Sequence, residues 1–317
     1  IARRQRQMCI RDSANTVAAL APNIWVMAFA RLLPALGLPV FWALASETAV
    51  NIVGPEYAGR AIAKIGFGIV CATVFGIPVG TLISDAWGWR SAFAILAVIA
   101  LAKALLLWVY LPAVKGVKEG VTLRSQFGLL RSPLMIGHIV LSVLVFSGMF
   151  TAYTYLADIL ERLAGFDGTL VGWCLMGFGA VGLIGNSLGG RMVDRHPLIA
   201  SMVFCAFMIG GMVALVPSIH STLGLAAAMG VWGVTQAALF LVSHVRLMKA
   251  APQAPAFAAS LNIAGANLGI GLGALFGGHV IDTYGLGSLG FAGAGFILVS
   301  IILASLLMAI KPRAVCA

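Results

Sequence analysis

The sequence predicts an all-α membrane protein, and the observations behind this prediction are its composition and the length of its apolar segments. Hydrophobic residues make up 61% of the 317 residues and charged residues 9%, and the mean hydropathy is +1.03. A soluble domain carries about 25% charged residues, so a chain this apolar requires lipid around it. The apolar segments are long and uniform, whereas the strands of a membrane barrel would alternate in polarity over about 10 residues.

Nine apolar segments follow one another along the chain. They are 24–46, 62–84, 90–111, 134–157, 170–190, 198–216, 223–246, 257–281 and 288–310. Each approaches the roughly 20 residues that cross a hydrocarbon core of about 30 Å as a helix. Because a helix satisfies its own backbone hydrogen bonds in lipid, we expect each segment to form one spanning helix.

Basic residues predict the orientation of these spans. Twelve lie in alternate connections or in the C-terminal tail: Arg60, Lys64, Lys115, Lys118, Arg124, Arg131, Arg191, Arg195, Arg246, Lys249, Lys311 and Arg313. Only Arg90 and Arg162 lie on the other side. Since Lys and Arg favour the cytoplasmic side, the loop 112–133 and the C-terminus are predicted to be cytoplasmic. The net charge of +10 therefore reflects topology and does not indicate nucleic-acid binding.

Residues 1–13 are expected not to belong to the native protein. The run from Met8 to Ser13 reads as the translation of the end of a common transposon-based sequencing adapter. Such segments are left out of reasoning about the fold. The alternative is a genuine basic cytoplasmic arm, and the native sequence is expected to begin at Ala14.

An internal repeat with an offset of 197 residues divides the spans into two halves. The offset pairs Gly68 with Gly265, Asp85 with Asp282, Gly88 with Gly285, and Ser91 with Ser288. Since the second half begins near 134, the first half should begin near position −63, which predicts a truncated first half. Parallel repeats of six spans, with a solute site at their interface, are typical of one large class of transporters.

The repeat and the spans predict five regions. They are the segment 1–13, a partial N-terminal helical bundle at 14–111, a cytoplasmic central loop at 112–133, a C-terminal six-helix bundle at 134–310 and a cytoplasmic tail at 311–317.

Three short stretches resemble known transporter signatures. Arg31 to Gly37 has an Arg followed by a spaced Gly, Gly76 to Thr81 reads Gly-x-Pro-x-Gly, and Gly190 to Arg195 reads Gly-x-x-x-Asp-Arg. They resemble the major facilitator superfamily, in its branch of bacterial drug, sugar and nucleoside:proton antiporters with twelve spans. The resemblance implies the major facilitator fold of two six-helix bundles, here with nine full spans and a stub. His196 and Pro197 depart from the loop signature, where further Gly and basic residues are usual.

The resemblance also implies roles for these residues. Arg31 is expected to tune a proton-carrying carboxylate, because a charge within a span is costly unless it faces a partner. The alternative is an Arg that extends to the outer interface. Gly76, Pro78 and Gly80 are expected to bend their span and to seal the outer half, and ordinary glycine-mediated packing is the alternative.

The loop signature predicts a gate on the cytoplasmic side. Asp194 and Arg195 are expected in a very short turn directly after the span that ends at Gly190, where the Asp194 carboxylate holds the N-terminus of an adjacent helix. The alternative is a solvated turn that carries ordinary positive-inside charge.

Polar and aromatic residues within the spans are candidates for a solute cavity. They are Trp42, His138, Tyr153, Trp173, Gln236, Asn262 and Asn267. Each has a structural alternative, since polar side chains also join helices and aromatic side chains also mark the membrane interface.

The sequence therefore favours a secondary transporter that exports sugars, nucleosides or drug-like solutes across the bacterial inner membrane by proton antiport. We expect a monomer whose partners are the solute, protons and lipid, with no cofactor. We also expect no metal, since the four cysteines outside the segment 1–13 fit no metal spacing. The alternatives are an uptake carrier of the same fold, by symport or facilitated diffusion, and an intramembrane enzyme. The catalytic motif His-Glu-x-x-His is absent, and so is a phosphate loop.

Overall fold

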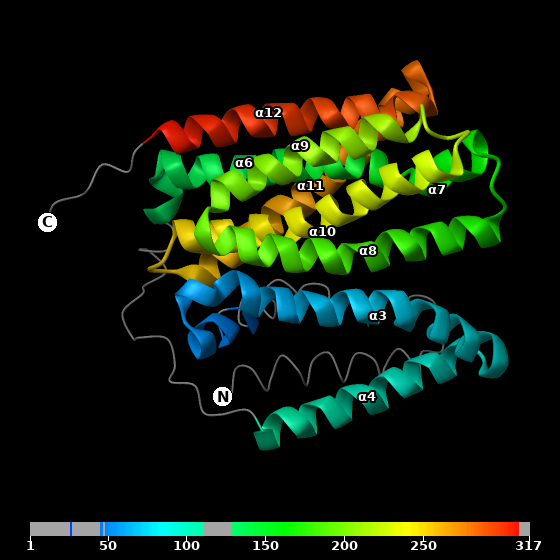
Figure 1. Ribbon diagram of the computed structural model, residues 1–317. Coiled ribbons are helices and arrows are strands. Elements are labelled where there is room, and N and C mark those ends of the chain that lie inside the picture. Colours follow the sequence, from blue (N-terminus) through cyan, green and yellow to red (C-terminus); the bar gives the residue numbers. More distant parts are fainter. Residues whose placement is uncertain (1–25, 27–44, 47, 111–127, 311–317) are drawn as a thin grey trace, which may run out of the picture.

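The computed structural model describes residues 26, 45–46, 48–110 and 128–310, and the elements assigned in these ranges are all helices (Figure 1). The all-α fold predicted from the sequence is confirmed for this part of the chain. The segment 1–13, nearly all of the first predicted span, most of the central loop and the tail 311–317 lie outside the described residues.

Six long helices account for the predicted spans between 134 and 310. They are α6 (Pro133–Tyr153), α8 (Gly168–Arg195), α9 (Pro197–Leu215), α10 (Thr222–Ala250), α11 (Pro255–Tyr284) and α12 (Leu289–Ala309). The short segments η2 (Leu129–Arg131), α7 (Leu156–Asp158), η3 (Ile159–Leu163) and η4 (Leu286–Ser288) flank α6 and α12. All six long helices are long and apolar enough to cross a membrane.

These helices form one bundle, in which α6 packs against α11 and α12, and α10 packs against α8 and α9. A stripe of glycines on α11 faces the backbone of α6. A Cβ at Gly269 would lie 2.5 Å from the Val143 carbonyl oxygen, and a Cβ at Gly277 would lie 2.5 Å from the Thr151 carbonyl oxygen. Only glycine permits this separation, and close backbone packing is one of the main sources of helix association in lipid.

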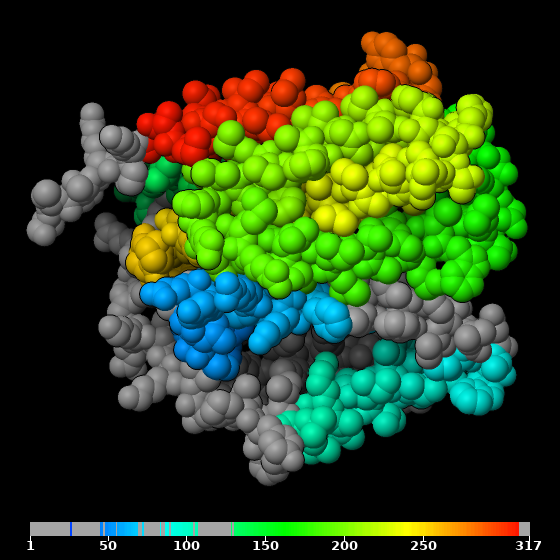
Figure 2. Space-filling view, in the orientation of Figure 1, coloured from blue at the N-terminus to red at the C-terminus, as the bar shows by residue number. Residues whose placement is uncertain are grey.

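Two long helices of the first half are described, α3 (Ala58–Trp87) and α4 (Trp89–Tyr110), and the turn η1 (Pro55–Tyr57) precedes α3. In Figure 1, α3 runs alongside α8, and α4 lies beyond α3. The space-filling view shows the start of α3, in blue, against the green helices of the bundle (Figure 2). The junction between α3 and α8 therefore joins the two halves.

The repeat is visible in the helices themselves. Both α3 and α11 contain 30 residues, and their bounds differ by the predicted offset. Gly88 and Gly285 follow them with φ of +82° and +81°, a conformation that favours glycine. The amides of Ser91 and Ser288 then donate to the carbonyls of Gly88 and Gly285 at 3.1 Å and 3.3 Å. We infer that α3 and α11 occupy equivalent places in the two halves.

The outer surface of the molecule is apolar, and its basic residues are concentrated at one end. Leu223 is 83% exposed and Leu275 is 76% exposed, which is the surface expected of a protein in lipid. The basic end is the end where α3, α6 and α9 begin and α8 and α10 end. Its described basic residues are Arg60, Lys64, Arg131, Arg191, Arg195, Arg246 and Lys249. This is the end that the sequence predicts to be cytoplasmic.

Candidate functional site

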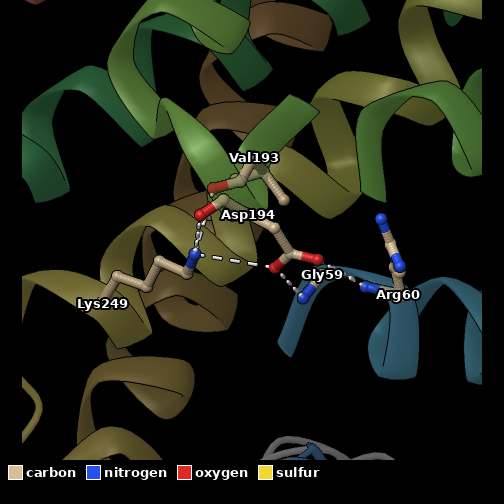
Figure 3. A network of polar contacts seen from close by, with 5 residues as sticks. All are labelled: Gly59, Arg60, Val193, Asp194 and Lys249. Carbon is tan, nitrogen blue, oxygen red and sulfur yellow. Dashed lines mark hydrogen bonds and ion pairs between the residues drawn. The ribbon is translucent and has the colours of Figure 1, made fainter. Parts of the chain in front are cut away.

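The Asp194 carboxylate contacts the first turn of α3 at the basic end (Figure 3). Its Oδ1 accepts a hydrogen bond from the Gly59 amide at 2.6 Å, and its Oδ2 accepts one from the Arg60 amide at 3.2 Å. Tyr57, which precedes α3, provides no side-chain cap. Asp194 thus satisfies two amides that lack partners within α3, and its negative charge faces the positive end of the helix dipole.

Lys249 joins α10 to the same contact. Its Nζ donates to the Asp194 carbonyl oxygen at 2.7 Å and to the Val193 carbonyl oxygen at 3.2 Å. The same Nζ lies 3.5 Å from Asp194 Oδ1, and the Asp194 side chain is only 8% exposed. A cation thus satisfies carbonyls at the end of α8, where the helix has no amides left to pair with them. We call Gly59, Asp194 and Lys249 the clamp.

Small residues bring α3 and α8 together beside the clamp. A Cβ at Gly190 would lie 2.9 Å from both the Gly59 carbonyl oxygen and the Ala63 Cβ. One turn earlier in α8, Asn186 Nδ2 donates to the Ala63 carbonyl oxygen at 2.7 Å. Because the helices approach at backbone distance, any larger residue at Gly190 would force them apart.

The prediction that Asp194 and Arg195 lie in a short turn is wrong. Residues 190–195 are the last turns of α8, and the connection to α9 consists of His196 alone, with φ −141° and ψ 81°. The reason is local, because Pro197 disfavours the helical conformation at His196 and starts α9 at its first position. The helical geometry directs Gly190 and Asp194 toward α3, while Arg195 is exposed.

Arg246 was expected to be a loop charge, and the structure shows it buried inside the bundle. Its side chain is 1% exposed, one turn before the end of α10. Nη1 lies 2.8 Å from His138 Nδ1, and Nη2 donates to Ser142 Oγ at 2.9 Å. The apolar segment ends near Arg246, but α10 continues to Ala250. Arg246 can lie inside the protein because partners on α6 satisfy its guanidinium.

The group around Arg246 extends to α11. Ser142 Oγ donates to Asn262 Oδ1 at 2.9 Å, and Asn262 is 3% exposed. Arginine can only donate, so His138 Nδ1 must accept, and its ring proton is then on Nε2. Among the described residues no carboxylate pairs with Arg246, and its Nε has no hydrogen-bond partner there. We call Arg246, His138, Ser142 and Asn262 the buried polar cluster.

Among the other cavity candidates, Tyr153 and Gln236 are linked through Phe178 and Trp232, whose rings meet edge to face with centroids 5.5 Å apart. Trp232 Nε1 donates to Gln236 Oε1 at 2.9 Å within α10, so Gln236 is buried and occupied. Tyr153 stacks on Phe178 with ring centroids 5.4 Å apart. Trp173, at 63% exposed, and Asn267 lie on the surface of this part of the chain.

Several predicted residues cannot be placed. Arg31 and Trp42 lie outside the described residues. The backbone of α3 continues through Gly76, Pro78 and Gly80, but the surroundings of these three residues also lie outside the described part. The predicted roles of all five therefore stay predictions.

Sequence reasoning used Lys249 only for the orientation of the spans and missed Gly59 and Ser142. Gly59 carried a detectable signal, because small residues spaced four apart on α3 and α8 favour a close helix crossing. Ser142 carried none, since a lone serine in an apolar span is common. Within the described ranges, no group of three His, Cys, Asp or Glu side chains is placed to hold a metal ion.

Comparison with known sequences identifies the family. The family description Major Facilitator Superfamily matches residues 13–256 and 165–315. A probable sugar efflux transporter of Helicobacter pylori (strain ATCC 700392 / 26695) is 30% identical over 284 residues, which cover 88% of this chain and 71% of that protein. An uncharacterized MFS-type transporter of Bacillus subtilis (strain 168), YtbD, is 31% identical over 292 residues, with 88% and 72% covered.

Solved structures show the same fold at low sequence identity. The human organic anion transporter MFSD10 superposes with a TM-score of 0.76 at 14% identity and covers 95% of this chain and 76% of its own. The Escherichia coli fucose:proton symporter FucP superposes with a TM-score of 0.76 at 17% identity, with 96% and 83% covered. The chain belongs to the Major Facilitator Superfamily and is a multi-pass membrane transporter.

Proposed function

We propose that this transporter exports small solutes of the sugar class in exchange for protons, by alternating access of one site to the two sides of the membrane. The observation that carries the proposal is the clamp, which closes the junction between α3 of the first half and α8 and α10 of the second. The sugar class rests on relatives that are named probable sugar efflux transporters.

The clamp has the strength that a reversible gate needs. A hydrogen bond to a charged group contributes about 1.5–3 kcal/mol, so two amides on one carboxylate hold the junction without locking it. Opening the basic end would expose the α3 amides to water, which replaces the lost partner. The closed state is then favoured by a margin that solute or proton binding can overcome.

The direction of transport has a specific alternative, which is uptake instead of export. The fold is shared with a fucose:proton symporter, so fold alone does not distinguish export from uptake. The resemblance of Gly76 to Thr81 to the antiporter signature favours export. Under this proposal Arg31 tunes the proton affinity of a carboxylate that releases its proton as solute binds.

Replacing Asp194 tests the clamp. Asp194→Ala removes the acceptor of both α3 amides, and we expect sugar transport into inverted membrane vesicles to fall about tenfold or more, because one such bond alone changes the closed population by that factor. The matched control is Asp167→Ala, whose Oδ1 accepts from the Leu170 amide at 3.0 Å within its own helix.

The protein should be expressed from the longest open reading frame that contains this sequence. Both variants should be compared at equal amounts of the protein in the membrane. Asp167→Ala is expected to retain transport, because it caps α8 alone and joins no second helix. Equal losses in the two variants would refute the gate, since they would reflect helix capping in general.

A further inference from the structure

A basic hollow lies beside the clamp, where α3, α8 and α9 meet at the basic end. Its volume is about 310 Å³, and its walls include Arg60, Arg191, Arg195 and His196 together with the apolar side chains of Met192 and Ile199. Arg60 comes from the first half and the others from the second. The hollow therefore crosses the same junction as the clamp and is lined by different side chains.

The guanidinium groups around the hollow have no acidic partner among the described residues. Among the described residues, the ion pairs are Asp158 with Arg162, at the opposite end of the molecule, and Asp194 with Lys249 in the clamp. The Asp194 oxygens are directed at backbone amides and at Lys249, and Figure 3 shows that the Arg60 side chain does not point at this carboxylate. Arg60 instead places Cζ 5.4 Å from the centre of the Tyr57 ring.

Topology alone does not account for this arrangement. The positive-inside bias places basic residues on one side of the membrane but does not require them to converge on one cavity. Three like charges around a hollow repel one another, and a bound anion would offset that repulsion. The planar guanidinium suits the oxygens of a phosphate group, with which it forms paired hydrogen bonds.

The apolar part of the wall indicates how the phosphate is presented. Ile199 of α9 lines the hollow and is 43% exposed. A free phosphate would gain nothing from Met192 and Ile199, whereas an acyl chain would cover them. We propose that the hollow binds the headgroup of an anionic phospholipid, with its phosphate among Arg60, Arg191 and Arg195.

Lipid titration of the purified 317-residue chain tests this site. Binding of phosphatidylglycerol and of phosphatidylcholine with the same acyl chains should be measured by native mass spectrometry from a neutral detergent. We expect phosphatidylglycerol to bind more tightly, and Arg191→Gln and Arg60→Gln each to weaken it about fivefold, the effect of roughly one basic residue at an anionic surface. Phosphatidylcholine binding should not change in either variant.

Arg131→Gln is the matched control, because Arg131 is an exposed arginine of the basic end that does not line the hollow. Arg191→Lys keeps the charge but loses the paired hydrogen bonds, so it should bind more tightly than Arg191→Gln and less tightly than the unchanged chain, which separates a lost site from a misfolded variant. An equal loss in Arg131→Gln would overturn the proposal, as would equal affinity for the two lipids. Displacement of the lipid by millimolar inorganic phosphate would also overturn it, because the ligand would then be a free anion.

Discussion

Arg246 brings a positive charge into the interior of the bundle, and its neighbours offer only neutral acceptors. His138 and Ser142 receive its N–H groups, and Asn262 in turn accepts from Ser142. A buried polar group is tolerated when its partners are in place and costly when one is removed. The buried polar cluster should therefore act as one unit that joins α6, α10 and α11.

Removal of the histidine tests this unit. His138→Leu leaves an Arg246 N–H without its acceptor, and we expect it to lower the free energy of unfolding by about 1–3 kcal/mol. Adding Arg246→Met to His138→Leu should recover most of that loss, because both polar partners are then absent. The measurement is the unfolding midpoint of the purified chain in mixed micelles containing increasing sodium dodecyl sulfate.

Thr283→Ala serves as the control, since Thr283 is exposed and bonds only to the His279 carbonyl in its own helix. It should leave the midpoint unchanged. If the double variant is as unstable as the sum of the single changes, the residues do not form one unit.

The residues of this cluster were only partly predictable. His138 and Asn262 were named as polar residues within spans, but for a cavity rather than for a joint between helices. Arg246 was assigned to a loop because hydropathy places the end of a span only approximately. Whether a charge near that end faces water or protein depends on which helices are neighbours, and a single sequence does not contain this information.

At the scale of helices, the glycine stripe of α11 sets the distance to α6. A Cβ at Gly273 would lie 3.0 Å from the Thr151 amide nitrogen and closer still to the Ser147 carbonyl oxygen. Gly271, two residues away on the same helix, is exposed and has no atom within 4 Å of such a Cβ. The two glycines therefore make a matched comparison, since Gly273 faces the α6 backbone and Gly271 faces away from the other helices.

Gly273→Leu should separate α6 from α11, and we expect it to destabilise the chain by about 1–3 kcal/mol or more, the usual cost of an overpacked contact. Gly271→Leu should be close to neutral, since its side chain would face open space. Thermal aggregation of the two variants in the same detergent distinguishes them. Equal midpoints would show that the helices can move apart freely, contrary to the backbone packing inferred here.

Helices were the most predictable level of this structure. Their lengths follow from the thickness of the membrane, so the eight predicted spans from 62 onward match α3, α4, α6 and α8 to α12 within a few residues at most ends. The larger errors lie where a helix leaves the apolar region. α8 reaches Arg195 and α6 is followed by η3 as far as Leu163, because polar residues there find partners or water outside the hydrocarbon.

The whole molecule is best understood through its repeat. The offset of 197 residues predicted that α3 and α11 correspond, and the structure gives them equal length and equivalent glycine ends. The offset also pairs Gly80 with Gly277, which meets the α6 backbone. The repeat therefore predicts that Gly80, like Gly277, lies at a close contact between helix backbones.

Proton coupling belongs to this largest scale, because it links a residue of one half to the movement of both. If Arg31 biases the proton affinity of a carboxylate, Arg31→Ala should abolish sugar transport driven by an imposed pH gradient. Solute exchange at equal pH should persist, since the solute site and the clamp are unchanged. Both rates should be measured in inverted vesicles that contain the protein expressed from its longest reading frame.

Arg162→Ala is the control for this experiment, because Arg162 is exposed and pairs only with Asp158 at the end opposite the clamp. An arginine that merely extends to the interface should behave like Arg162, with both rates unchanged on replacement. A selective loss of the pH-driven rate in Arg31→Ala would support antiport. If the pH-driven rate survives in Arg31→Ala, Arg31 has no part in proton coupling. The proton affinity of the coupling carboxylate must then be set by residues other than Arg31.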